Sequence, residues 1–331
     1  MDKSGLENIA KKLVEGNKGI LAADESFGTI EKRFKKINID STDDTRKAYR
    51  QMLFSTGGVE EYISGVIMFD ETIKQSTRNG KHFVELLNEK GIVSGIKVDT
   101  GTVALAGFPG EKITEGIDGL RERLKEYVNL GAKFTKWRAV ITIGDGIPSS
   151  TCIHANAHLL ARYAALAQEA GLVPIVEPEV LMDGVHDIEQ CEIVTTLTLD
   201  EVFSELLKNK VYLPGMLLKP NMVVPGKEST KPSTPEQIVE ATLRTFRKSV
   251  PKDVPGIVFL SGGQTPVEAM NNLCAMNRDE RHPWALSFSF GRALQDEALA
   301  AWQGKEENIK IAQEAFYARA KSDAMARKGV C

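Results

Sequence analysis

Eight short apolar runs rich in β-branched residues recur along the chain, and helical patterns fill the gaps between them. Nearly continuous apolar character is typical of parallel strands that are buried on both faces. The runs are GILAAD (19–24), SGVIMF (64–69), VSGIKVD (93–99), KFTKWRAVI (133–141), LVPIVEPE (172–179), GMLLKPN (215–221), GIVFLSGG (256–263) and ALSFSFG (285–291). This alternation predicts an α/β fold, a (β/α)8 TIM barrel. A doubly wound sheet is the alternative, but no GxGxxG motif follows the first run.

No change of composition or long linker marks a second domain, so we expect one barrel domain over residues 1–331. Ser4 and Glu7 fit a capping box, which predicts an N-terminal helix that ends at Gly16. Further helices are expected over residues 118–130 and 150–170, and after the Thr-Pro pairs at 234–235 and 265–266. Residues of about 303–331 should form a C-terminal helix and tail.

Composition and charge exclude several classes of protein. The formal net charge of −3 favours neither nucleic acid nor an acidic membrane surface. We find no signal peptide or transmembrane run, and the four cysteines are scattered without CxxC spacing. We therefore expect a cytoplasmic protein with reduced thiols. His154 and His158 lie four residues apart, but the sequence offers no third ligand, so we interpret them as a helix surface and expect no metal site.

Charged residues gather at the carboxyl ends of the expected strands, which form the active face of a barrel. These ends carry Asp24, Lys97, Asp99, Lys136, Arg138, Glu177, Glu179, Lys219 and Arg292. Lys136 and Arg138 are two residues apart, as are Glu177 and Glu179, so each pair shares one face of its strand. Single ion pairs inside a barrel can be structural. Asp99 in particular can serve only to pair with a neighbouring lysine. The convergence of the whole set indicates a catalytic site.

Lys219 stands inside an apolar run and is followed directly by Pro220, an unusual place for an ammonium group. A neutral lysine amine can attack a carbonyl, and the iminium that forms is an electron sink for C–C cleavage. An apolar pocket and a nearby cation such as Lys136 both disfavour the ammonium form of a lysine. Glu177, Glu179 and Asp24 are candidates to move protons, and crowding of carboxylates should raise one of their pKa values.

Two further groups of residues are typical of anion sites. The glycine-rich SGG at 261–263 frees backbone N–H groups, and FGRA at 290–293 adds an arginine. Phosphate sites in barrels often follow strands seven and eight. Lys32 and Arg33 form a second basic cluster, which is either another phosphate site or a solvated helix start.

The motifs GILAADES, GIKVD, KWR, PIVEPE, LLKPN, FLSGGQ and FSFGRAL occur in this order. In this combination the chain closely resembles class I (Schiff-base) fructose-1,6-bisphosphate aldolases, from about residue 5 to about residue 325. The resemblance implies a lyase of glycolysis and gluconeogenesis that cleaves fructose 1,6-bisphosphate reversibly into dihydroxyacetone phosphate and glyceraldehyde 3-phosphate. It also implies a homotetramer with a phosphorylated sugar as its ligand and no cofactor or metal.

The resemblance also implies roles for single residues. Lys219 corresponds to the Schiff-base lysine, Glu177 to the main proton-transfer residue and Glu179 to its partner. Asp24 corresponds to the aspartate that handles the C4 hydroxyl, and Lys136 to the lysine that assists carbinolamine chemistry. The implied substrate-binding residues are Lys97 and Arg138, then Ser261, Gly262, Gly263, Ser289, Gly291 and Arg292 for the C1-phosphate, and Ser26, Thr29, Lys32 and Arg33 for the C6-phosphate end.

Three alternatives remain at this stage. A transaldolase-like transferase, or an aldolase for a different phosphosugar, would use the same lysine chemistry. A metal-dependent aldolase is the second alternative, but this sequence lacks the histidine cluster that zinc would need. A binding or scaffold protein on an inactive barrel would have been indicated by loss of Lys219, Glu177 or Arg292, and all three are present.

Overall fold

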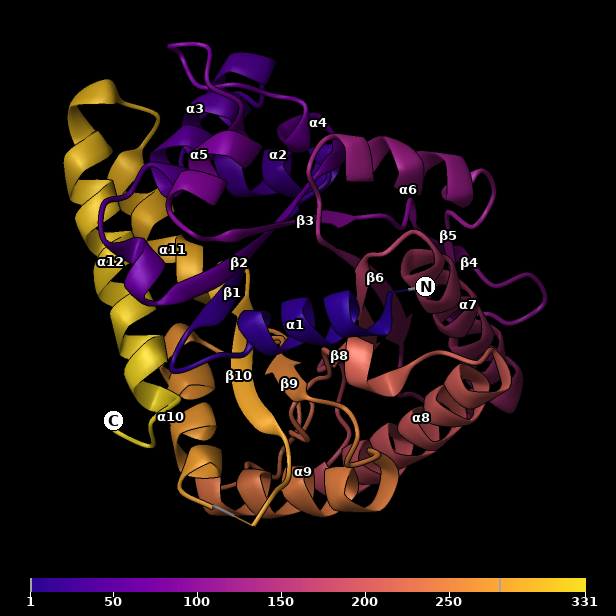
Figure 1. Cartoon of the computed structure of the whole chain (residues 1–331). Coiled ribbons are helices and arrows are strands. Elements are labelled where there is room, and N and C mark those ends of the chain that lie inside the picture. The colour runs from indigo at the N-terminus through magenta and orange to yellow at the C-terminus, as the bar shows by residue number, and fades with distance from the viewer. Residues whose placement is uncertain (1, 280) are drawn as a thin grey trace.

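Eight parallel strands close into a barrel in this computed structural model, which describes residues 2–279 and 281–331. The strands are β1 (Gly19–Ala23), β2 (Ile63–Met68), β3 (Val93–Lys97), β6 (Phe134–Ile141), β7 (Val173–Val180), β8 (Leu217–Leu218), β9 (Gly256–Phe259) and β10 (Ala285–Phe290). They pair in the order β1-β10-β9-β8-β7-β6-β3-β2 (Figure 1). Each lies within or overlaps one of the eight predicted runs, so the predicted fold class is confirmed.

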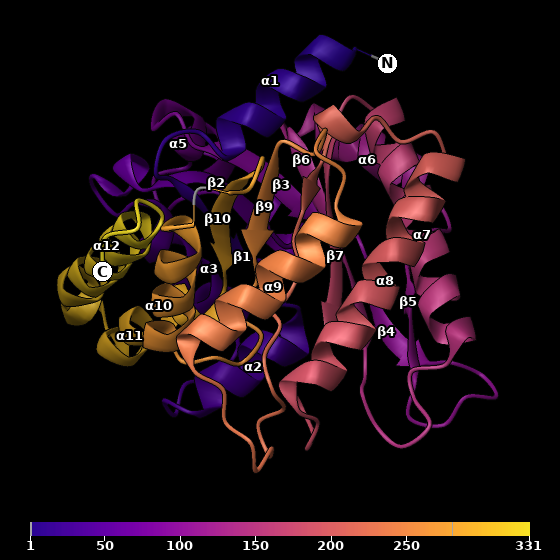
Figure 2. The same ribbon diagram turned by 90° about the horizontal axis from the view of Figure 1, so that it is seen from below.

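Helices surround the barrel on the outside (Figures 1 and 2). They are α2 (Phe27–Lys35), α3 (Asp43–Phe54), α4 (Asp70–Ile73), α5 (Phe83–Glu89), α6 (Leu120–Asn129), α7 (Ser150–Glu169), α8 (Ile188–Lys208), α9 (Pro235–Ser249), α10 (Pro266–Asn277), α11 (Arg292–Trp302) and α12 (Ile309–Ala326). Thr234 and Thr265 cap α9 and α10 as predicted, each with a proline in the first turn. None of the helices described is both long and apolar enough to cross a bilayer.

The N-terminal helix α1 (Lys3–Leu13) packs across the end of the barrel where the strands begin (Figure 2). Leu6, Ala10 and Leu13 are buried there against residues such as Phe134 and Val173. The predicted capping box was wrong, because the side chain of Asp2 accepts the hydrogen bond from the Gly5 N–H. With this end filled by apolar side chains, only the opposite end of the barrel can open into a cavity.

One exposed hairpin was not predicted. Strands β4 (Gly101–Ala104) and β5 (Lys112–Glu115) pair antiparallel between β3 and α6. They are short, and three of the four β4 residues are exposed, so they lack the apolar run by which the barrel strands were found. The hairpin begins beside the carboxyl end of β3, where Thr100, Gly101 and Thr102 line the barrel mouth.

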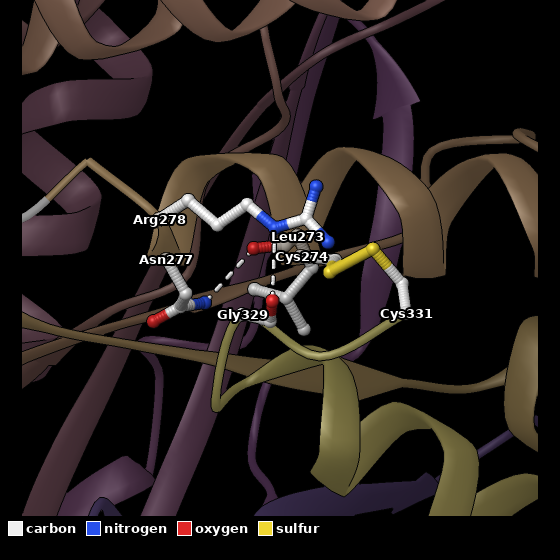
Figure 3. The surroundings of a disulfide bond; sticks show 6 residues. All are labelled: Leu273, Cys274, Asn277, Arg278, Gly329 and Cys331. Atoms are coloured by element: carbon white, nitrogen blue, oxygen red, sulfur yellow. Dashed lines mark hydrogen bonds between the residues drawn. A yellow bond between two sulfur atoms is a disulfide. The ribbon is translucent and has the colours of Figure 1, made fainter.

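The C-terminal segment is fastened to the barrel by contacts that the sequence did not reveal. Cys274 of α10 and Cys331 form a disulfide, with Cα atoms 6.2 Å apart, and Arg278 Nε donates to the Gly329 carbonyl (Figure 3). The expectation of four reduced thiols was therefore wrong for this pair, while Cys152 and Cys191 are free and buried. The two bonded cysteines are 57 residues apart and meet only because α12 returns against α10.

Candidate active site

A cavity of about 1210 Å³ opens at the carboxyl ends of the barrel strands. Of the seventeen predicted site residues, sixteen line it: Asp24, Ser26, Thr29, Lys32, Arg33, Lys97, Lys136, Arg138, Glu177, Glu179, Lys219, Ser261, Gly262, Ser289, Gly291 and Arg292. Gly263 is the exception and directly follows the lining residue Gly262. The fold thus brings together residues from seven of the eight predicted strand regions.

Lys219 extends the short strand β8, because its N–H donates to the Val176 carbonyl of β7 at 2.8 Å. Its side chain is almost fully buried, and Nζ lies 3.4 Å from Glu177 Oε1. The other oxygen of Glu177 lies 3.3 Å from Lys136 Nζ, which is also 2.6 Å from Asp24 Oδ2. Two lysines and two carboxylates, on β6 and β7 and directly after β1 and β8, thus form one buried row of charges.

The charges within this buried row shift the pKa values of Asp24 and Lys136. Burial disfavours the Asp24 carboxylate, but the nearby charges of Lys136 and Lys219 outweigh burial and lower its pKa to about 2. Burial also disfavours the Lys136 ammonium, yet Asp24 and Glu177 raise its pKa above the ordinary value. The carboxylate whose pKa crowding was expected to raise is therefore not Asp24, because its contacts with lysines outweigh the neighbouring negative charge.

A second group of ion pairs lies on the β3–β7 side of the mouth. Lys97 Nζ contacts Asp99 Oδ1 at 2.5 Å, and Arg138 Nε contacts Glu179 Oε2 at 2.5 Å. The backbone N–H of Arg138 also donates to Asp99, at 3.2 Å. Asp99 therefore pairs with a neighbouring lysine, as the sequence allowed, and also positions the β6 backbone. Lys97 and Arg138 still line the cavity.

The predicted C1-phosphate residues gather around the turns after β9 and β10. Gly262 and Gly263 have φ of +59° and +93°, a backbone conformation that favours glycine. Ser261 and Ser289 are buried, and Ser289 Oγ has no hydrogen-bond partner among the described residues. Gly291 and Arg292 begin α11, so its free N–H groups and the arginine face the same turn region. Helix N-termini with free N–H groups favour anions.

Lys227 is a cation in this region that sequence reasoning missed. A Cβ on Gly263 would lie 2.8 Å from Lys227 Nζ and 3.9 Å from an Arg292 nitrogen, so both cations adjoin the SGG turn. The Lys227 N–H donates to the Met182 carbonyl, and its ammonium pairs with Asp183 at 3.2 Å. In the sequence Lys227 stands in a polar loop with one further lysine, Lys231, and nothing there distinguishes the two.

At the other side of the mouth lie the residues predicted for the C6-phosphate end, and within the described part of the chain only some of them are free of ion pairs with neighbouring carboxylates. Ser26 and Thr29 hydrogen-bond to each other at 3.1 Å, and Lys32 lines the cavity. The Arg33 guanidinium is buried and binds Glu25 and, at 2.9 Å, Asp296. Arg33 is thus already paired with two carboxylates.

Glu25 also binds Arg50 at 2.6 Å. Its role as a shared partner of two buried arginines was not apparent from the sequence, in which Arg50 lies in a helix far from residue 25.

The cavity as a whole favours anions. Ten cationic side chains line it, against seven carboxylates, although the whole chain has a net charge of −3. A cleft with one excess sign of charge attracts ligands of the opposite sign. A buried lysine beside proton-carrying groups, between two basic regions, can act covalently on a carbonyl compound with an anionic group at each end.

Comparison with known proteins agrees with this geometry. The model of the family "Fructose-bisphosphate aldolase class-I" matches residues 5–330. The chain is 54% identical over 313 residues to cytosolic fructose-bisphosphate aldolase 4 of Arabidopsis thaliana, covering 94% of this chain and 80% of that protein. It is 51% identical over 325 residues to a probable class 1 fructose-bisphosphate aldolase of Xylella fastidiosa, covering 98% and 97%.

A solved structure is also similar. Fructose-bisphosphate aldolase from Plasmodium falciparum, crystallised in complex with TRAP and a small-molecule inhibitor, superposes with a TM-score of 0.97 at 49% sequence identity. The match covers 98% of this chain and 94% of that one.

Proposed function

The chain belongs to the class-I fructose-bisphosphate aldolase family, and from this premise we propose how its cavity performs the reaction. As a member it is a metal-independent lyase of glycolysis that cleaves fructose 1,6-bisphosphate into dihydroxyacetone phosphate and glyceraldehyde 3-phosphate. The observation that carries the proposal is the position of Lys219: its amine lies inside the cavity, 3.4 Å from a carboxylate that a second lysine also contacts.

In the first half of the reaction, the neutral amine of Lys219 attacks C2 of the open-chain sugar and forms a carbinolamine. Glu177 donates a proton to the C2 hydroxyl, which leaves as water, and the iminium remains. Lys136 keeps its positive charge because Asp24 and Glu177 surround it, so it stabilises the oxygen on which negative charge develops. The Glu177 carboxyl lies between the two lysines and can serve both steps.

In the second half, the C4 hydroxyl passes its proton to the Glu177 carboxylate left by the dehydration while the C3–C4 bond breaks, which releases glyceraldehyde 3-phosphate. The electron pair moves into the iminium and gives an enamine. Asp24 is ionised, with a pKa of about 2, so it can hold the C4 hydroxyl through a charge-assisted hydrogen bond. Protonation of C3 and hydrolysis of the iminium then release dihydroxyacetone phosphate and restore the Lys219 amine.

We assign substrate binding to the two basic regions of the mouth. Backbone N–H groups of the SGG turn and of the α11 N-terminus, together with Arg292, would hold the C1-phosphate. Ser26, Thr29 and Lys32 would hold the C6-phosphate, whereas Arg33 supports that end through its ion pairs with Glu25 and Asp296. Lys97 and Arg138, between the two regions, would contact the sugar hydroxyls.

Borohydride trapping with dihydroxyacetone phosphate in the presence of a chelator tests the assignment of Lys219. We expect a reduced, stable adduct on Lys219 in peptide mass spectrometry. Lys219→Ala should form no adduct and lose turnover, while phosphate binding is partly kept. An adduct on a different lysine, or full activity of Lys219→Ala, would overturn the assignment.

We further propose that the protein acts in the cytoplasm as a homotetramer. The support for the location is that similar plant aldolases are named cytosolic. The support for self-association is an apolar stripe on α8, where the side chains of Ile193 and Leu197, one turn apart, are 60% and 53% exposed. Contiguous exposed apolar side chains often mark contact surfaces between proteins.

A further inference from the structure

Two helices of the outer layer, α7 and α8, lie side by side and bring four potential metal ligands together (Figure 1). His154 and His158 are four residues apart on α7, and Glu201 and Glu205 are four residues apart on α8. His154 Nδ1 lies 2.7 Å from Glu201 Oε1, and His158 Nδ1 lies 2.8 Å from Glu205 Oε2. None of the four lines the catalytic cavity.

Three of these four side chains lie close enough together to hold one ion. A ligand atom each from His154, Glu201 and Glu205 can be chosen so that all three lie within 4.8 Å of one another. The rings of His154 and His158 are roughly parallel, with centroids 6.3 Å apart, and His158 shares the Glu205 carboxylate. The sequence showed only two histidines without a third ligand, and packing of α8 against α7 supplies two carboxylates.

We propose that His154, His158, Glu201 and Glu205 form a zinc site that fastens α7 to α8. Imidazole nitrogen and carboxylate oxygen are common zinc ligands, and four donors suit its tetrahedral preference. Calcium and magnesium prefer shells made of oxygen alone, so two imidazoles disfavour them. The site is structural, because none of its residues lines the catalytic cavity.

Two nearby features affect how tightly this site would bind zinc and from which side the ion would enter. Lys208 Nζ pairs with Glu205 Oε1 at 2.8 Å, so its positive charge opposes a cation on the same carboxylate. Glu205 is buried, whereas the side chain of His154 is 59% exposed, so an ion can enter from the His154 side. The apolar stripe of α8 ends one turn before Glu201, so binding is best measured on the native assembly.

Isothermal titration of the chelator-treated, non-reduced protein with zinc chloride tests the proposal. We expect one zinc ion per chain, bound at least about tenfold more weakly by His158→Gln and by Glu201→Gln. Lys208→Met should bind zinc more tightly, because it removes the opposing charge.

Controls are chosen from the same residue types. His82→Asn, at the start of α5, and Glu189→Gln, in the first turn of α8, should leave zinc affinity unchanged. Circular dichroism identifies any variant that fails to fold, and aldolase turnover should be equal in all of them. With cobalt as the probe, a tetrahedral absorption spectrum should appear in the wild type and be lost in His158→Gln.

The alternative is that these residues form two surface ion pairs and nothing more. In that case zinc binds no tighter to the wild type than to His158→Gln and Glu201→Gln, and the proposal is overturned. It is also overturned if Lys208→Met and the wild type bind zinc equally and cobalt gives only an octahedral spectrum. Neither result would alter the assignment of Lys219, which is tested separately by trapping.

Discussion

Glu177 occupies a position between two lysines, within 3.4 Å of Lys219 and 3.3 Å of Lys136. A carboxyl placed there can pass protons to and from both amines and their adducts. Glu177→Gln keeps the shape of the side chain but cannot accept a proton. We expect its turnover to fall by about 10²–10⁴-fold, the usual effect of losing a positioned acid or base. Steady-state assays of fructose 1,6-bisphosphate cleavage measure this, with Glu189→Gln as control, and a loss below tenfold would contradict the role.

Lys227 lies against the SGG turn beside Arg292 and is a second cationic side chain of the C1-phosphate region. Lys227→Met should raise the KM for fructose 1,6-bisphosphate by about tenfold, the scale of one hydrogen bond to a charged group, while kcat changes little. Lys231→Met is the matched control, because Lys231 stands in the same loop but pairs with Asp187. Equal KM values for the two variants would remove Lys227 from the phosphate site.

At the scale of single elements, α12 contains an unusual buried acid. The Asp323 side chain is fully buried, its oxygens have no hydrogen-bond partner among the described residues, and burial raises its pKa to about 8. In the unfolded chain an aspartate titrates near pH 4. Between about pH 4 and pH 8 the folded state therefore retains a proton that the unfolded state loses, so folding stability declines as pH rises through this window.

Asp323→Asn removes this titration. We expect the variant to gain about 1–3 kcal/mol in unfolding free energy relative to the wild type at pH 8, and much less at pH 4. Urea unfolding at the two pH values measures the difference, and exposed Asp253→Asn serves as the control. If the unfolding free energies of both variants change with pH as that of the wild type does, the Asp323 carboxyl is not protonated in the folded state.

At the scale of the whole molecule, the stripe of Ile193 and Leu197 on α8 is the surface that we expect to join copies of the chain. A charged side chain there would have to be desolvated in an interface. Ile193→Lys combined with Leu197→Lys should therefore lower the mass measured by light scattering from that of a tetramer. Val267→Lys is the control, because Val267 is equally exposed but on α10. An unchanged mass in the double variant would place the interface elsewhere.

The sequence by itself determined the barrel and most of its catalytic mouth. Each strand is a local apolar run, and each of the caps at Thr234 and Thr265 is a signal of a few residues, so both can be found without tertiary information. Parallel strands that end at one face then bring Asp24, Lys136, Glu177 and Lys219 together wherever the intervening helices lie. The motif resemblance added roles for these residues that spacing alone could not provide.

Only the tertiary structure decided which side chains meet across helices. The Cys274–Cys331 disulfide joins residues 57 apart, and the histidines of α7 meet glutamates 47 residues away on α8. Lys227 reaches the SGG turn, and Arg33 is held by Glu25, through packing of the same kind. A sequence pattern reports the period of one element, whereas these contacts depend on the rotation and offset of two elements against each other. The helix packing therefore determined them, and no local signal revealed them.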